Sequence, residues 1–301
     1  MLMVDTVRTD PAAGGLATTG TGEPGTGPRT RLGMRLLGSE LALVFRRPRN
    51  LAALGVLALV PVLIGVAVRI FGPETGDQAQ LIVTRVAGNG LFLTFVSFII
   101  LTVMLLPVTV AVVSGDTVAG EANSGTLRYL LAAPAGRTRL LVIKYVSIVA
   151  FCLAACLVVA ASALIAGMLL FPVGPITLLS GTTIPFTDGL LRVVLVVGYV
   201  TAGMAALGAV GLAISTLTEA PIGAIAATAA CVIIAQVVHA IPQISVVHPY
   251  LVSHWWTVFD GVLRDPMALD QMGQGLLVFA AYIVVFGSIA WAKFTSRDIS
   301  S

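Results

Sequence analysis

The sequence predicts an all-α integral membrane protein with six transmembrane helices, and two observations predict it. Of the 301 residues, 57% are hydrophobic and only 10% are charged, whereas an ordinary globular protein has about 25% charged residues. Apolar runs of about 20 residues, long enough to cross a bilayer, recur along the chain. The mean hydropathy of +1.01 agrees with both. This composition excludes a soluble enzyme, a nucleic-acid-binding protein and a disordered tail.

The N-terminal region comes first. Residues 1–30 are rich in Gly, Thr and Pro, so we expect a disordered cytoplasmic tail. No apolar segment follows the start, which argues against a signal peptide. Residues 31–45 mix Arg and Glu with regularly spaced Leu, a pattern typical of an amphipathic helix lying on a membrane surface. The alternative is an ordinary cytoplasmic helix.

The next feature is a set of six apolar runs, which we assign as spanning helices within a single transmembrane domain over residues 31–299. They cover residues 51–71, 91–113, 145–171, 190–215, 221–241 and 275–292. Only Thr216–Ala220 separates the fourth run from the fifth, and Pro221 suits the first position of a helix. We therefore expect an antiparallel helical hairpin here rather than one long helix over 190–241. Small residues at fourfold spacing in the fourth run predict close helix packing (Gly198, Ala202, Ala206).

The basic residues predict the orientation. Seven Arg precede the first run, four basic residues lie between the second and third runs, and two follow the last, which leaves four for the other side. Because Lys and Arg concentrate in cytoplasmic loops, we expect both termini in the cytoplasm of a multi-pass cell-membrane protein. Trp255 and Trp256, with Tyr250 nearby, are expected to anchor at the outer interface, and Trp291 at the inner one.

The connection at 114–144 is the one long polar insertion expected on the cytoplasmic side. Gly115, Gly120 and Gly125 interrupt its apolar pattern. Residues 126–132 then form one or two helical turns that end before Pro134. This short helix exposes Leu127, Leu130 and Leu131 beside Arg128 and Tyr129. A solvated loop would not need such residues, so we interpret the segment as a docking helix for another protein.

The residues of this connection resemble a family signature. The motif Glu121, Gly125-Thr126-Leu127, Leu130-Leu131, Pro134, Arg137 and Lys144 is similar to that of ABC-2-type exporter permeases. Two weaker stretches agree, namely Glu40-Leu41 with Arg46-Arg47-Pro48-Arg49, and Phe294 with Arg297-Asp298-Ile299. The resemblance covers roughly residues 35–299 and leaves out the N-terminal tail.

The resemblance implies an architecture and partners. It implies an amphipathic helix before the first span, a coupling helix between spans two and three, and an extracellular helical segment at about 242–274. Two permease units would pair as a homodimer or with a related permease, and each would dock on a separate ATP-binding cassette subunit. The coupling residues would be Glu121, Gly125, Thr126, Leu127, Arg128, Tyr129, Leu130, Leu131, Pro134 and Arg137.

The chain is not expected to be an enzyme. A phosphate-binding loop needs a Lys after Gly, but Lys144 and Lys293 are the only lysines and neither follows Gly. We therefore expect no cofactor of its own, with ATP and Mg on the partner subunit. No G-x-S-x-G elbow is present. His239, His248 and His254, with Asp260, lack the H-E-x-x-H spacing of a metal site, so no metal is expected.

Other polar and sulfur-containing residues lie within the apolar runs. Cys152, Cys156 and Cys231 are interpreted as small core hydrophobes. Gln236 and His239 lie near the outer end of the fifth run, where they would line a substrate path. The alternative for both is a hydrogen bond between helices.

The sequence therefore favours the membrane-spanning permease subunit of an ATP-binding cassette exporter. The alternative is a membrane component that couples an ATPase to assembly, signalling or drug-target protection. A secondary transporter would need acidic residues at mid-membrane, and Asp116, Glu121 and Glu219 all lie at span ends. Glu121 is expected to cap the docking helix or to pair with Arg128 or Arg137.

Overall fold

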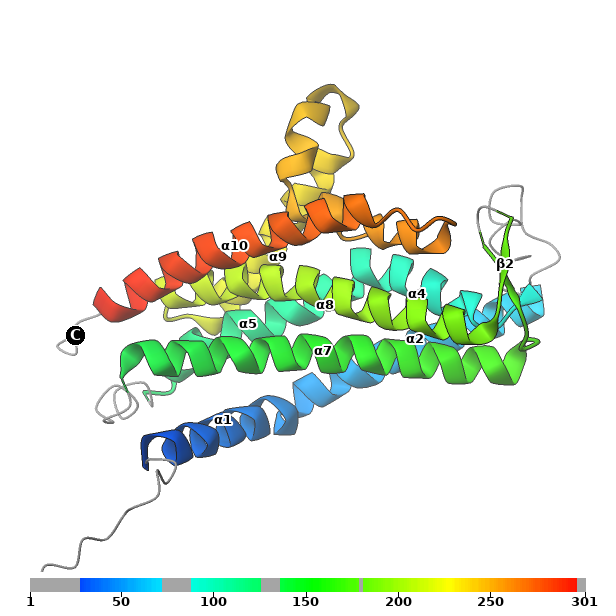
Figure 1. Cartoon of the computed structure of the whole chain (residues 1–301). Helices are drawn as coiled ribbons and strands as arrows, with labels where there is room; N and C mark the ends of the chain where they lie inside the picture. Colours follow the sequence, from blue (N-terminus) through cyan, green and yellow to red (C-terminus); the bar gives the residue numbers. More distant parts are fainter. Residues whose placement is uncertain (1–27, 72–87, 126–135, 179–180, 297–301) are drawn as a thin grey trace, which may run out of the picture.

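The computed structural model is built almost entirely from helices, and six of them are long and apolar enough to cross a membrane. It describes residues 28–71, 88–125, 136–178 and 181–296. Figure 1 shows the long helices side by side along one direction. The six helices are α2 (Pro48–Phe71), α5 (Leu105–Asn123), α7 (Arg137–Leu170), α8 (Phe186–Leu217), α9 (Pro221–His239) and α10 (Leu269–Ser296). The prediction of a helical protein with six helices able to cross a membrane is therefore confirmed.

The first helix, α1 (Pro28–Arg46), coincides with the predicted amphipathic segment and begins inside the predicted tail. Pro48 then opens α2, because a Pro in the first turn of a helix loses no hydrogen bond. Both helices pack against α7. In Figure 1, α1 lies below α7, and α2 continues from it and passes behind α7. The remainder of the predicted tail lies outside the described residues.

The second predicted span is interrupted, which corrects the expectation of one helix over 91–113. Its first part is α4 (Phe92–Val103), and Met104, with φ −110° and ψ −65°, separates it from α5. Gly115 and Gly120 do not break α5, which continues to Asn123. A Cβ on Gly115 would lie 2.8 Å from the backbone nitrogen of Ile225 in α9. Gly115 is therefore a close helix contact rather than a helix end.

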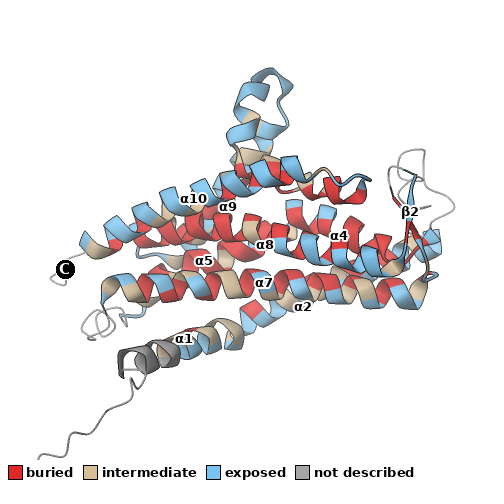
Figure 2. Ribbon diagram, viewed as in Figure 1, coloured by how far each residue is buried: buried red, intermediate tan, exposed pale blue. Residues whose placement is uncertain are grey.

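Helix α8 forms the centre of the bundle and is the most buried of the six. It packs against α5, α7, α9 and α10. Small residues allow these contacts, since a Cβ on Gly208 would lie 2.6 Å from Ile148 of α7. Figure 2 shows α8 largely buried and the outward side of α10 exposed. Helix α8 ends at Leu217, two residues beyond the predicted end of the fourth run, and, as predicted, a short connection leads to α9 at Pro221.

Two short segments of other structure join the helices. Between α7 and α8, β1 (Ile176–Thr177) pairs antiparallel with β2 (Thr183–Ile184) around Gly181, whose φ of 84° favours glycine. This hairpin departs from the purely helical prediction. It arises where the polar stretch between the apolar runs is long enough to fold back on itself.

The segment between α9 and α10 consists of 3-10 turns. They are η2 (Pro242–Tyr250), η3 (Val252–Trp255) and η4 (Val258–Leu263), and part of this segment projects beyond α10 in Figure 1. The predicted interface anchors Trp255 and Trp256 are buried instead. Tyr199 of α8 donates to the carbonyl of Trp255 at 2.8 Å, so the tryptophans belong to the core. Tyr250 is exposed, as an interface residue would be.

Candidate functional site

Charged side chains from four helices gather at one end of the bundle in two clusters. In the first, Lys144 of α7 lies between two carboxylates. Its Nζ donates to Glu40 Oε1 of α1 at 3.1 Å and also to Glu121 Oε1 of α5. Lys144 is 0% exposed and Glu40 is also buried. This cluster therefore joins α1, α5 and α7 through charges that are removed from water.

The second cluster lies at the start of α2. Arg47, at the junction of α1 and α2, and Arg49, in the first turn of α2, both pair with Oδ2 of Asp116 in α5. Asp116 is buried, whereas the two Arg are partly exposed. A buried carboxylate is costly unless cations and hydrogen bonds compensate it. The two Arg supply that compensation and hold the junction of α1 and α2 against α5.

Glu121 therefore has a partner that the sequence analysis did not identify. We expected Arg128, Arg137 or a helix cap. The structure pairs Glu121 with Lys144, while Arg128 and the helix to be capped lie outside the described residues. Glu121 stands in the last turn of α5, and Lys144 stands two turns into α7. Glu121 and Lys144 are 23 residues apart in the chain, so no helical spacing predicts their contact. Only the packing of α5 on α7 brings them together.

The predicted docking helix lies between these anchored helix ends. Thr126, Leu127, Arg128, Tyr129, Leu130, Leu131 and Pro134 fall outside the described residues. On one side of them, Gly125 has a φ of +70° and its N–H donates to the carbonyl of Ala122, which ends α5. On the other side, α7 begins at Arg137.

The start of α7 is also fixed to the end of α10. Arg137 Nη1 donates to the carbonyl of Thr295 at 2.7 Å. Trp291 Nε1 of α10 donates to Thr138 Oγ1 at 3.0 Å. The helix ends on either side of residues 126–135 are therefore held by other helices: the end of α5 by α7, and the start of α7 by α10.

Ser215 was not singled out from the sequence, yet it joins α8 to α5. Its Oγ donates to the carbonyl of Gly115 at 2.7 Å and accepts the N–H groups of Val118 and Ala119 at 3.0 and 2.9 Å. A side chain that inserts into the backbone ladder distorts a helix locally. A serine in an apolar helix usually bonds its own preceding turn, so the sequence carries no signal for this contact.

The predicted substrate-path residues lie elsewhere. Gln236 of α9 donates to the carbonyl of Val103 at 3.4 Å, where the break at Met104 leaves the α4 ladder incomplete. This contact is the helix–helix hydrogen bond that was the alternative interpretation. His239 ends α9 and faces the 3-10 segment, where its ring centroid lies 4.9 Å from that of His248 and 5.2 Å from that of His254.

The three imidazoles come together although their sequence spacing indicated no site. The pKa of His254 lies below its usual value because burial disfavours the charged ring and because positive charge on His239 and His248 opposes it. Within the described part of the chain, no group of three or more His, Cys, Asp or Glu side chains is arranged to hold a metal ion. Among the cysteines, Cys152 and Cys156 are core residues as predicted, whereas Cys231 is exposed, contrary to the prediction.

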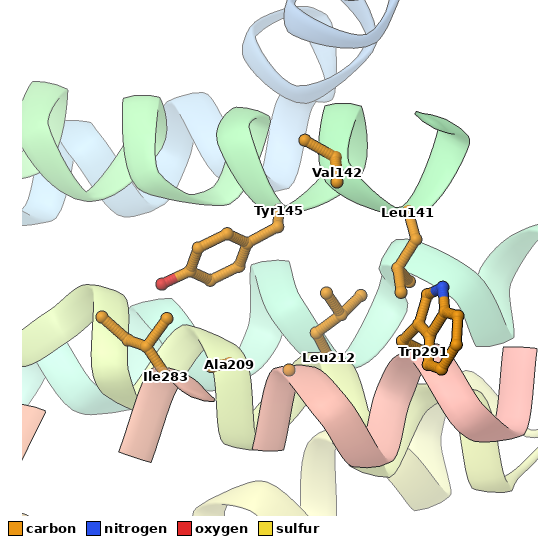
Figure 3. A pocket seen from close by; sticks show the side chains of 8 residues that line it. Leu141, Val142, Tyr145, Ala209, Leu212, Ile283 and Trp291 are labelled. Atoms are coloured by element: carbon orange, nitrogen blue, oxygen red, sulfur yellow. The ribbon is translucent and has the colours of Figure 1, made fainter. Parts of the chain in front are cut away.

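A small apolar cavity of about 150 Å³ lies between α7, α8 and α10. Figure 3 shows Trp291 close to Leu141 at one end and Tyr145 directed toward Ile283 at the other. Ligand pockets usually measure about 300–1,000 Å³. This cavity is below that range and offers no charged group, so we do not assign it a ligand.

The chain matches one known protein family. A family model described as "Protein of unknown function (DUF2705)" matches residues 78–300. No curated protein matches the chain. The matched region contains Asp116, Glu121, Lys144 and the segment between α5 and α7, whereas Glu40, Arg47 and Arg49 precede it.

Proposed function

The chain belongs to the DUF2705 family, whose function is unknown, and we propose that it is the membrane permease subunit of an ATP-driven exporter that couples to a separate ATP-binding subunit. The observation that carries this proposal is buried Lys144, which joins Glu40 and Glu121 and so ties α1, α5 and α7 together. The segment proposed to dock on the ATP-binding subunit, residues 126–135, connects α5 to α7 in the chain.

A coupling element must pass a displacement to the helices that line the transport path. A segment attached to loosely held helix ends would absorb a push locally. Here, the Glu121–Lys144 pair holds α5 to α7 next to the segment, and Arg137 holds the start of α7 to α10. Ser215 extends the connection from α5 to the central helix α8. A push on residues 126–135 would therefore move four helices together.

The charges that hold this region are hard to separate once buried. Removing one partner of a buried ion pair costs about 3–5 kcal/mol, far more than the 0–1 kcal/mol of an exposed pair. The clusters thus resist shear between α1, α5 and α7, so that these helices move as one unit. This behaviour supports a mechanical role and requires no catalytic residue in the chain.

The remaining parts of the proposal follow from the sequence. Segment 126–135 and both termini lie in the cytoplasm, the side on which Arg and Lys concentrate. Energy comes from a partner, because the chain has no phosphate-binding loop. Two copies, or this chain and a related permease, form the path. Segment η2–η4 then faces the outside as the helical element between the last two spans.

The test is reconstitution of the full chain with the ATP-binding subunit that co-purifies with it. ATP hydrolysis and the movement of a lipophilic dye are measured in the same proteoliposomes. ATP-dependent dye movement that stops when the partner's phosphate-binding lysine is replaced would support the exporter. ATP hydrolysis that responds to the permease without movement of any tested cargo would favour the non-transport alternative. Failure to bind any ATP-binding subunit would refute both.

A further inference from the structure

A groove runs between α8, α9 and α10. Its volume is about 400 Å³ and its lining is almost entirely apolar, within the usual range of ligand pockets. The walls come from α9 and α10, the floor from α8, and the residues Leu251, Val252 and Trp256 of the 3-10 segment close one end. The groove is partly open to the surface at the depth of the spanning helices.

Buried polar atoms without protein partners occur at several places in the described residues, and three of them belong to residues 253–256, which include the groove-lining Trp256. Within the described residues, Ser253 Oγ, His254 Nδ1 and Trp256 Nε1 are buried and have no hydrogen-bond partner. Trp256 is 1% exposed and itself lines the groove. Buried polar atoms are normally hydrogen-bonded to protein or to ordered molecules. Three orphans within four consecutive residues therefore indicate a polar group from outside the chain.

The three imidazoles stand at the end of the groove that the 3-10 segment closes. His248 Nε2 lies 3.2 Å from the carbonyl oxygen of Val238, which lines the groove, and the ring centroid of His239 lies 4.9 Å from that of His248. The rings of His248 and His254 are 6.3 Å apart. Three rings this close repel one another when protonated, so an anion among them would be stabilising.

The charged residues on the neighbouring described segments do not supply the anion that the three imidazoles would bind. Asp260 of η4 pairs with Arg264 at 3.9 Å. Arg192 of α8 donates to the carbonyls of Val262 and Arg264, and Asp270 lies in the first turn of α10. None of the ion pairs in the described ranges involves His239, His248 or His254.

We propose that this groove holds one acyl chain of an acidic phospholipid, with the headgroup phosphate against the imidazoles of His239, His248 and His254. The apolar groove matches the chain, and the imidazoles with the orphaned donors of η3 match the phosphate. The inference goes beyond the proposed transport function and does not depend on an ATP-binding partner.

Trp256 provides the first measurement. A full chain carrying Trp255→Phe and Trp291→Phe emits from Trp256 alone. Because its indole is 1% exposed, lipid around the bundle does not reach it, and only a chain inside the groove can quench it. We expect quenching in nanodiscs that contain phosphatidylglycerol brominated on its acyl chains as a minor component of phosphatidylcholine. Bromine on the phosphatidylcholine instead should quench less.

The pH dependence tests the headgroup contact. A phosphate that stabilises protonated imidazole raises its pKa, so binding is tighter at about pH 5.5 than at about pH 8. The affinity should fall about tenfold for each pKa unit that the headgroup adds to one imidazole. Replacing all three His by Gln should abolish this dependence and the preference for phosphatidylglycerol.

Ala235→Phe should fill the groove and abolish quenching, whereas Ala226→Phe on the same helix, outside the groove lining, should not. In the unaltered chain, the exposed Cys231 on the groove wall reports occupancy independently. Its alkylation by N-ethylmaleimide should slow when phosphatidylglycerol is added to detergent micelles. This readout applies even if the tryptophan variants do not fold.

Three results would overturn the proposal. Equal quenching by both lipids at both pH values would remove the headgroup contact. Absence of quenching in a folded variant, with Cys231 alkylated at the same rate in every lipid, would show an unoccupied groove. Protection of Cys231 without quenching, in a sample that is dimeric, would show that a second copy of the chain covers the groove.

Discussion

Replacement of Lys144 by Met tests whether the first charged cluster holds the bundle together. Lys144 is 0% exposed, and its ammonium is shared by Glu40 and Glu121. Met has a similar length but no charge, so the variant leaves two buried carboxylates facing each other. Loss of one partner of a buried pair predicts a loss of about 3–5 kcal/mol in the free energy of unfolding.

A compensated variant separates the charge from the packing. Lys144→Met combined with Glu40→Gln and Glu121→Gln removes all three charges while nearly preserving side-chain volume. Because replacing a whole buried ion cluster with neutral groups is often close to neutral, we expect this triple variant to recover most of the lost stability. The matched control is Arg264→Met, whose pair with Asp260 is 59% and 46% exposed, with an expected loss of about 0–1 kcal/mol.

The measurement is reversible unfolding of the full chain in mixed micelles, followed by circular dichroism. The reasoning would be refuted if Lys144→Met cost no more than the Arg264→Met control. It would also be refuted if the triple variant were less stable than the single one, since packing rather than charge would then explain the loss.

Four further predictions concern coupling and topology. Glu121→Gln should lower transport per ATP while leaving expression and dimer formation intact, because Lys144 keeps its pair with Glu40; an unchanged amount of transport per ATP would mean that Glu121 has only a structural role. Leu130→Asp should release the ATP-binding subunit while the chain still inserts, because it places an unpaired charge in an apolar contact; an intact, fully active complex would contradict the docking assignment. Ser215→Ala should cost about 1–3 kcal/mol of unfolding free energy, because it leaves buried backbone groups of α5 unpaired; no change by thermal melting would mean that water replaces the hydroxyl. In a Cys-free background, Cys at exposed Val246 of η2 should react with an impermeant maleimide from outside and Cys at exposed Ser124 only from inside; the reverse pattern would invert the orientation.

The apolar runs show how far the sequence alone reaches. Hydropathy is a property of a continuous segment, and a bilayer accepts only segments that satisfy their own backbone. The positions of five of the six spans could therefore be predicted closely without knowing what each helix touches, whereas the second, predicted over 91–113, is α5 (Leu105–Asn123) in the structure. Pro221 at the start of α9 followed in the same way, because its effect on the backbone is local.

Features that depend on neighbouring helices could not be read in this way. The sequence places Gly115 and Gly120, which interrupt the apolar pattern, in the polar connection after the second run, but α5 continues through both, because packing stabilises a helix that local propensity would weaken. Trp255 and Trp256 looked like interface anchors, but contacts with α8 and α10 bury them. Composition alone does not distinguish a tryptophan at a membrane surface from one in a core.

For the charged residues of the candidate site, the sequence likewise predicted some of the residues but not their contacts. The motif predicted that Glu121, Arg137 and Lys144 matter, and the weaker N-terminal stretch added Glu40, but neither predicted that Lys144 would join both carboxylates. Glu40 and Lys144 are 104 residues apart, so their contact depends on how α1, α5 and α7 pack. The sequence determined which segments enter the membrane because each segment exchanges water for lipid on its own. Tertiary structure decided which charges meet, because that depends on the distances between helix ends in space.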